Sequence, residues 1–210
     1  MVRHFPIDIY MRLLGLDKHC FSDWWTKLPE GSTMVVQPKI EGFAIGLRYK
    51  YGQLVNAYSR EHTEIIENIR TISTIPLSID DSLKVEVELE GVLYSPSFNT
   101  EFSNGQLLSN IQSQIHPDSP LAFMAFQIFC SKDDELSDLT QLQKWGFEVP
   151  ITLRTDDPRQ VKRWHSQWMN KELFVNLPTN GIVAKCNSSN TKSSLGVSSS
   201  APNWALALTR

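Results

Sequence analysis

Hydrophobic and polar residues alternate along the segment from Met34 to Arg60, as they do in strands with one buried face. A run of β-forming residues leads to Lys39, and a Lys-Ile-Glu-Gly step follows at residues 39–42. Apolar side chains then occupy every second position: Phe43, Ile45, Leu47 and Tyr49. A turn at residues 50–53 reverses the chain. The pattern therefore predicts a strand that ends near Lys39 and a hairpin that returns Arg60 towards it.

Four other segments repeat their apolar residues at helical spacing. These predicted helices lie within residues 61–72, 104–115 and 139–145, and after the Asp157-Pro158 step that is typical of a helix start. Strand patterns recur at residues 83–89, 121–130, 181–186 and 203–208. The 121–130 segment is apolar almost throughout, which predicts a central strand covered on both faces. The serine-rich residues 188–200 predict a loop.

Acidic residues gather on one face of the strand predicted at 83–89. Its apolar residues face one way, and Glu86, Glu88 and Glu90 face the other. Three carboxylates in a row repel one another unless a metal ion or a cationic ligand lies over them. A solvent-exposed strand face is the alternative, and the sequence leaves both open.

The first 33 residues have the least regular pattern. We expect them to form a helical lead-in, with residues 34–210 as the main domain. The paired Trp24 and Trp25 are more typical of a packing wall than of a base-stacking platform. The clustered basic residues Arg159, Lys162 and Arg163 are typical of the solvated face of a helix.

The composition is that of an ordinary globular domain. The chain has 210 residues, of which 41% are hydrophobic and 20% charged. No segment approaches the ~18 apolar residues that a membrane span needs, and we expect neither a membrane partner nor a secretion signal. The three widely spaced cysteines indicate reduced thiols in an intracellular, reducing compartment such as the cytoplasm or nucleoid. The net charge of -3 argues against an extended surface for nucleic acid.

The chemistry of Lys39 depends on its surroundings. A lysine amine attacks phosphorus only after it loses its proton, and a neighbouring cation or partial desolvation favours that loss. Taken alone, the four-residue step is more typical of a solvated lysine at a strand end, with Gly42 at a bulge.

A series of segments, in order along the chain, resembles the adenylation domain of NAD-dependent DNA ligases, which belongs to the covalent lysyl-nucleotidyltransferase superfamily. The segments are PKIEG, AYSR, ENIRTISTIPL, LAFMAF, KWGFEVP, LPTNGIVAKCN and LGVSSSAPNWALAL, between about Met34 and the C-terminus. The resemblance implies an α+β fold, in which two packed antiparallel sheets are flanked by helices and the nucleotide lies in the cleft between them.

The resemblance also implies roles for individual residues. Lys39 falls on the lysine that takes up AMP as a phosphoramidate, Arg60 on an arginine that holds the sugar-phosphate region, and Lys185 on a lysine that contacts the α-phosphate. Gln37 stands where a glutamate usually reads adenine, and its carboxamide oxygen can accept the same hydrogen bond. The other residues implied in cofactor binding are Ile40, Glu41, Gly42 and Glu88. The resemblance further implies Mg²⁺, with Glu88 and Asn180 as its candidate ligands.

Several positions depart from the family pattern. Glu41 replaces an aspartate, Asn180 replaces an acidic residue, and Thr209 stands where the family has an essential lysine, with Arg210 beside it. With 38 residues before Lys39, we expect no complete nicotinamide-mononucleotide module. We also expect that the chain cannot encircle DNA alone.

These observations support three hypotheses. The first is a polynucleotide ligase that forms lysyl-AMP from NAD or ATP and seals nucleic-acid ends, DNA or RNA, with help from another protein or domain. The second is a catalytically degraded domain that binds an adenine nucleotide or a protein partner. The third is an RNA ligase or a capping-type nucleotidyltransferase.

Overall fold

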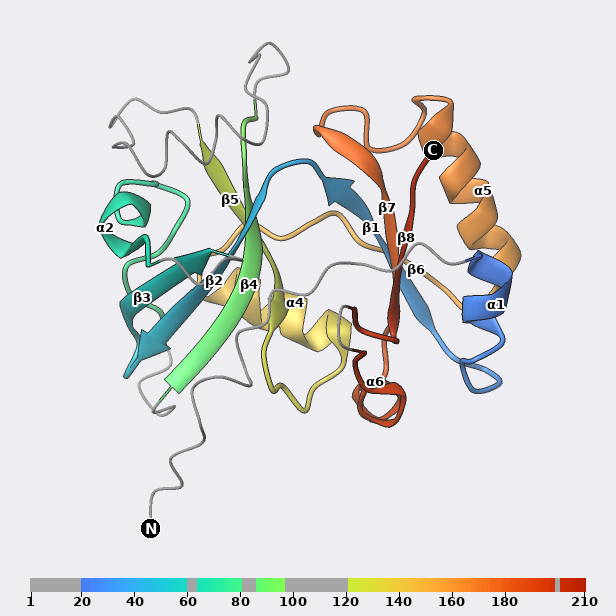
Figure 1. Cartoon of the computed structure of the whole chain (residues 1–210), viewed down its shortest axis with the longest axis horizontal. Coiled ribbons are helices and arrows are strands. Elements are labelled where there is room, and N and C mark those ends of the chain that lie inside the picture. Colours follow the sequence, from blue (N-terminus) through green and yellow to red (C-terminus); the bar gives the residue numbers. More distant parts are fainter. Residues whose placement is uncertain (1–19, 60–63, 81–85, 97–120, 199–200) are drawn as a thin grey trace.

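The computed structural model in Figure 1 describes residues 20–59, 64–80, 86–96, 121–198 and 201–210. The described residues form two four-stranded sheets, in which all pairs of neighbouring strands are antiparallel. The first, named here the β1 sheet, has the order β6 (Leu153–Thr155), β1 (Met34–Ile40), β7 (Thr179–Cys186) and β8 (Ala205–Leu208). The second, the β2 sheet, has the order β3 (Gln53–Ser59), β2 (Phe43–Lys50), β4 (Glu86–Tyr94) and β5 (Ala122–Ile128). The expected α+β architecture with two antiparallel sheets is confirmed.

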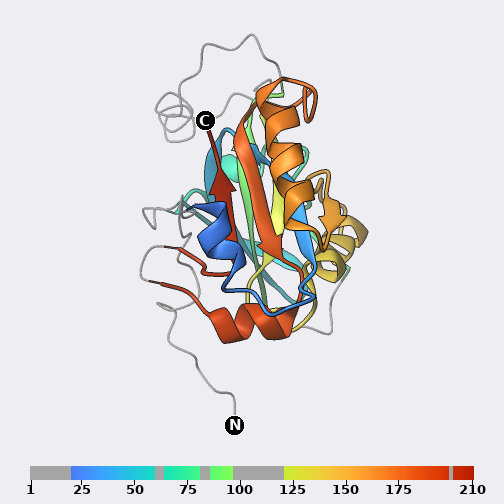
Figure 2. The same cartoon turned by 90° about the vertical axis from the view of Figure 1, so that its right-hand side faces the viewer.

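Helices cover the outer face of each sheet. Helices α1 (Phe21–Trp25) and α5 (Pro158–Met169) lie side by side over the β1 sheet, as Figure 2 shows, and bury Trp24 and Val161 against it. Helices α2 (Ile66–Ile69) and α4 (Glu135–Lys144) pack on the β2 sheet through Ile69, Leu139 and Leu142. Burial of Trp24 confirms the prediction that the tryptophan pair belongs to the packing of the domain.

A smaller apolar cluster joins the two sheets. Val92 and Tyr94 of β4 and Met124 of β5 pack against Ile40 of β1 and Leu177. The chain itself passes from β1 to β2 at this end through residues 41–42. The β1 sheet and the β2 sheet are therefore in contact at the Lys-Ile-Glu-Gly step.

Local signals fix several element boundaries as predicted. The Asp157 carboxylate accepts the backbone N–H of Arg159, and Pro158 occupies the first turn of α5. Gly146 follows α4 at a φ of +90°, a conformation that glycine adopts without steric cost. The turn between β2 and β3 and the strand β7 also lie where the alternation places them.

Two predictions about elements were wrong. The apolar segment 121–130 forms β5, which lies at the edge of its sheet rather than at the centre. It is apolar because one face packs into the core of the β2 sheet and the other into the cluster between the sheets. The serine-rich segment forms α6 (Ser189–Leu195) rather than a loop, because the Ser188 hydroxyl caps it by accepting the N–H of Thr191.

The helix predicted at 104–115 lies outside the described residues. The strand predicted at 83–89 is described from Glu86 onwards and extends beyond the predicted end to Tyr94. All three cysteines are free thiols, as predicted. Among the described residues, no helix is both long and apolar enough to cross a bilayer. The division at residue 33 stays a prediction.

Candidate functional site

Lys39 lies at the end of β1, where the chain leaves one sheet for the other. The pairing of β1 with β7 shifts register between Pro38 and Ile40. The N–H of Glu41 donates to the carbonyl of Pro178 at 2.7 Å, which anchors the crossing. A side chain at Gly42 would overlap the Leu93 carbonyl, since an added Cβ would lie 2.2 Å from that oxygen. The glycine after Lys39 is therefore required by the close approach of β4.

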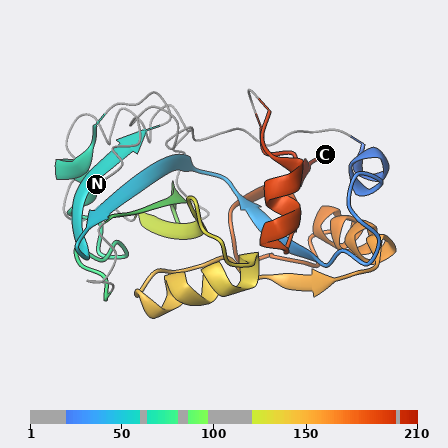
Figure 3. The same ribbon diagram turned by 90° about the horizontal axis from the view of Figure 1, so that it is seen from below.

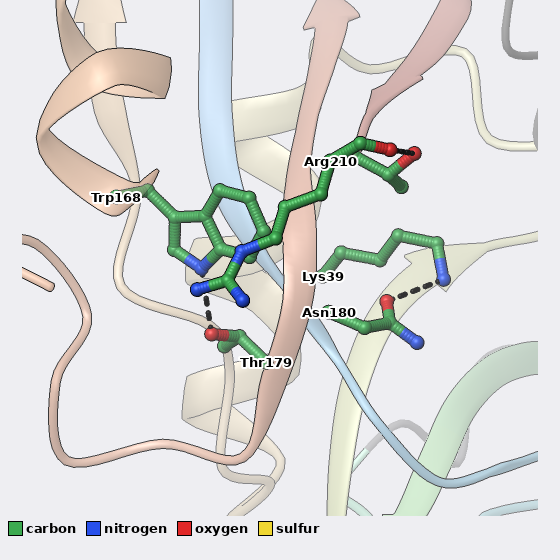
Figure 4. Close-up of a pocket in the computed structure, with 6 residues that line it drawn as sticks. Lys39, Trp168, Thr179, Asn180 and Arg210 are labelled. Atoms are coloured by element: carbon green, nitrogen blue, oxygen red, sulfur yellow. Dashed lines mark hydrogen bonds between the residues drawn. The ribbon is translucent and has the colours of Figure 1, made fainter. Parts of the chain in front are cut away.

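Lys39 borders a hollow of about 430 Å³ near the start of β7, together with Trp168, Thr179, Asn180, Thr209 and Arg210 (Figure 4). The Lys39 Nζ donates to the Asn180 Oδ1 at 2.8 Å. The Arg210 guanidinium lies over the Trp168 ring at 5.7 Å from its centroid, and the Trp168 Nε1 donates to the Thr179 hydroxyl at 2.8 Å. Figure 4 shows the Lys39 amine and Asn180 on one side of β7 and the Arg210 guanidinium with Trp168 and Thr179 on the other, so the two cations do not converge on one point.

Lys185 has different partners from Lys39 in this conformation. Its side chain is only 5% exposed, and its Nζ donates to the Glu135 Oε1 at 2.6 Å and to the Phe126 carbonyl at 3.0 Å. Lys185 pairs with Val35, four residues before Lys39 on β1, which corresponds to about 13 Å along the strand. The expectation that the two lysines meet at one point is therefore not realised here, because Glu135 draws the Lys185 amine towards α4.

The remaining predicted nucleotide contacts are distributed around the crossing. Gln37 is buried on β1, and its amide nitrogen donates to the Thr152 hydroxyl at 3.1 Å. Ile40 packs in the cluster between the sheets, whereas the Glu41 side chain is exposed. Arg60 lies outside the described residues.

The acidic face of β4 has a counter-ion that neither interpretation of the sequence included. Arg48, on the neighbouring strand β2, places its Nε 2.6 Å from the Glu88 Oε1 and 3.0 Å from the Glu86 Oε1. Arg48 and Glu88 are paired in the strand register, so their side chains share one face of the sheet. An arginine therefore offsets the repulsion for which a metal, a ligand or solvent was expected.

The predicted magnesium ligands do not form a ready-made site. Glu88 lies on β4 in contact with Arg48, and Asn180 lies on β7 in contact with Lys39. No group of three histidine, cysteine, aspartate or glutamate residues gathers anywhere in the described part of the chain. Each candidate contacts a cationic side chain, and the two lie in different sheets, so they do not fit one shared magnesium ion.

Glu135 and Lys192 are polar residues that sequence reasoning missed. Glu135 opens α4 and is 2% exposed, and its second oxygen accepts a hydrogen bond from the Lys192 amine on α6. Burial raises the pKa of the Glu135 carboxyl, but Lys185 and Lys192 together outweigh this effect, so the pKa lies below its ordinary value. In the sequence, Glu135 is typical of an acidic residue at a helix start, and nothing local distinguishes it because its partners are 50 and 57 positions away.

Comparison with known proteins places these features in a family context. The family described as NAD-dependent DNA ligase adenylation domain matches residues 16–111 and 99–209. A DNA ligase of Mycoplasma genitalium is 28% identical over 194 residues, and one of Mycoplasma capricolum is 29% identical over 198 residues. Each alignment covers 82% of this chain but only 29% and 30% of the respective relative.

Solved structures of ligases share the fold. A Lig E DNA ligase structure superposes with a TM-score of 0.59 at 13% identity, covering 94% of this chain and 68% of that one. An archaeal ATP-dependent RNA ligase superposes with a TM-score of 0.61 at 12% identity, covering 99% of this chain and 48% of that one. At these identities the likeness concerns the fold alone.

Proposed function

We propose that this chain, which belongs to the NAD-dependent DNA ligase adenylation domain family, forms a covalent lysyl-AMP on Lys39 as the first step in sealing nucleic-acid ends. The observation that supports this most directly is the hollow beside Lys39. The lysine amine and Asn180 border it on one side of β7, and the Arg210 guanidinium and Thr179 border it on the other side. The hollow leaves room for the phosphate of a nucleotide next to the lysine amine.

The reaction needs only a few groups from the protein. The deprotonated Lys39 Nζ attacks the α-phosphorus of NAD, a P–N bond forms, and nicotinamide mononucleotide leaves with the electrons of the broken P–O bond. Negative charge builds up on the phosphoryl oxygens in the transition state, and cations fixed nearby stabilise this charge. Arg60 and Lys185 are proposed to add their charges when the nucleotide is bound, as the family pattern implies.

The family description favours NAD as the AMP donor, with ATP as the alternative. Gln37 is proposed to contact the adenine, and Glu88 remains a proposed contact of the nucleotide. The chain spans less than a third of the relatives' length. With a net charge of -3, we propose that it engages nucleic-acid ends together with another protein or domain.

A second candidate is a nucleotide-binding domain without turnover. The Asn180 Oδ1 accepts a hydrogen bond from the Lys39 amine, and this uncharged amide stands where the family pattern has an acidic residue. Thr209, which takes the place of the family's essential lysine, also lines the hollow and carries no charge. Both replacements remove a charge that the family pattern has, without preventing nucleotide binding.

Incubation with NAD or ATP, each with magnesium, followed by intact-mass measurement distinguishes these candidates. We expect an increase equal to one AMP that is lost in Lys39→Ala but retained in Lys144→Ala, where an exposed lysine on α4 is removed. An adduct from ATP alone would exclude NAD as the donor. No adduct from either donor, together with a thermal shift in AMP, would reject the enzyme and support the binding domain.

A further inference from the structure

Glu135 is a fully buried carboxylate shared by two lysines that come from different elements. Lys185 reaches it from β7 at 2.6 Å, and Lys192 reaches its other oxygen from α6. Figure 3 shows that the start of α4 lies beside α6, which brings Glu135 within reach of both. The two ammonium groups share the one carboxylate of Glu135, and the Asp138 carboxylate, which follows on α4, also attracts Lys192.

The two lysines differ in what else holds them. Lys192 lies over the Trp204 ring at 4.9 Å from its centroid, and its side chain is 14% exposed. Lys185 instead spans the two sheets, since its Nζ also donates to the Phe126 carbonyl of β5. Lys192 is thus fixed at the outer end of the cluster, whereas Lys185 faces the second sheet.

A single buried ion pair would hold Lys185 where it is. If its amine turned to a phosphate, the carboxylate left behind would be buried without a partner, and such a charge is strongly unfavourable. The second lysine removes this penalty, because Glu135 keeps one ammonium group within hydrogen-bond distance. The Lys185 amine can then turn to an anion while Glu135 stays paired with Lys192.

We propose that Lys192 is a positioning residue that retains Glu135 and so allows Lys185 to exchange its carboxylate partner for the phosphate of a bound adenine nucleotide. This inference rests on the proposed function, since it takes the nucleotide bound beside Lys39 as the anion. A purely structural ion-pair cluster would instead stabilise the fold without discriminating between a phosphorylated ligand and an unphosphorylated one.

Calorimetric titration with AMP and with adenosine tests the proposal. Lys192→Met keeps an unbranched side chain and removes the charge. We expect it to weaken AMP binding at least tenfold and to leave adenosine binding unchanged. Adding Glu135→Gln to this variant removes the buried carboxylate charge that would lose its partner, and is expected to restore AMP affinity to within threefold of the original protein. Lys144→Met, on the exposed face of α4, serves as the matched control.

Three outcomes overturn the proposal. They are unchanged AMP affinity in Lys192→Met, equal losses for AMP and adenosine, and failure of the double variant to recover. Glu135→Gln alone, with Lys192 intact, keeps the test decisive if Lys192→Met does not fold: we expect AMP affinity equal to or higher than that of the original protein, and a tenfold loss would refute the exchange.

The adduct measurement on the same samples separates the two proposals. AMP binding that follows the expected pattern without any adduct would reject the enzyme but support the role of Lys192. An adduct on Lys39, together with unchanged AMP binding in Lys192→Met, would support the enzyme but reject the role of Lys192. Failure of the original protein both to bind AMP and to form the adduct would reject both.

Discussion

Gly42→Ala tests whether the crossing between the two sheets is packed as closely as the structure indicates. An added Cβ would lie 2.2 Å from the Leu93 carbonyl oxygen and 2.7 Å from the Val92 Cγ2, whereas ordinary contacts begin at 3.4 Å. Leu93 is paired with Phe43 on one side and Phe123 on the other, so the carbonyl cannot yield alone. One sheet must therefore shift by about 1 Å, the difference between these distances.

The cost follows from this overlap. Overpacking of a well-filled site typically costs about 1–3 kcal/mol. For a domain of this size, each kcal/mol lowers the melting temperature by about 2–4 °C, so we expect a decrease of about 2–12 °C. Lys39 is three residues away on the same crossing, and the yield of its AMP adduct is expected to fall as well.

Urea unfolding and intact-mass measurement of the adduct provide the two assays. Gly31→Ala is the control, because its Cβ would meet no atom within 4 Å and only the φ of +75° opposes it. That conformation costs about 1–2 kcal/mol in a residue other than glycine. We expect Gly31→Ala to lower stability but not the adduct yield. A Gly42→Ala protein with an unchanged urea midpoint and full labelling would refute the close packing described here.

Three further substitutions test the packing and charges of the described residues. Ile182→Ala, at a position with no exposed surface, is expected to lower the unfolding free energy by about 2–5 kcal/mol, and the exposed Val175→Ala by less than about 0.5 kcal/mol, both measured in urea. Burial raises the pKa of the Asp138 carboxyl to about 6, so ionisation of this carboxyl opposes folding above that pH. Asp138→Asn should therefore be more stable than the original protein at pH 7, and the difference in stability should shrink as the pH falls through 6. A difference that stays constant from pH 7 to pH 5 would contradict this. Arg48→Met should cost about 1.5–3 kcal/mol in urea because Glu88 loses its charged hydrogen-bond partner, and a simultaneous Glu88→Gln should recover part of that loss.

Much of the fold was predictable because its signals are local. The alternation from Phe43 to Tyr49 fixes the face of β2 that enters the core, and all four of its apolar residues are buried. The Asp157-Pro158 step fixes the start of α5 through a hydrogen bond between residues two positions apart. The ordered motifs likewise led to the family before any contact was known, and the place of Lys39 at the end of β1 followed from the strand pattern.

The tertiary structure decided what depends on distant parts of the chain. An apolar segment is compatible with a central strand or with an edge strand covered on both faces, and only the order of the sheet places β5 at the edge. The partners of Lys185 were equally hidden. Its charge is visible in the sequence, but the carboxylate that binds it lies 50 residues away on another element.

The sequence therefore determined the family, the face of β2 that enters the core and the start of α5, since ordered motifs, alternation and helix caps are properties of neighbouring positions. Folding decided which partner each charged side chain contacts: Glu88 contacts Arg48, Glu135 contacts Lys185 and Lys192, and Lys39 contacts the Asn180 amide. These pairings arise because hydrogen bonds and ion pairs require contact in space, and strands that lie far apart in the chain provide that contact only after the two sheets have assembled.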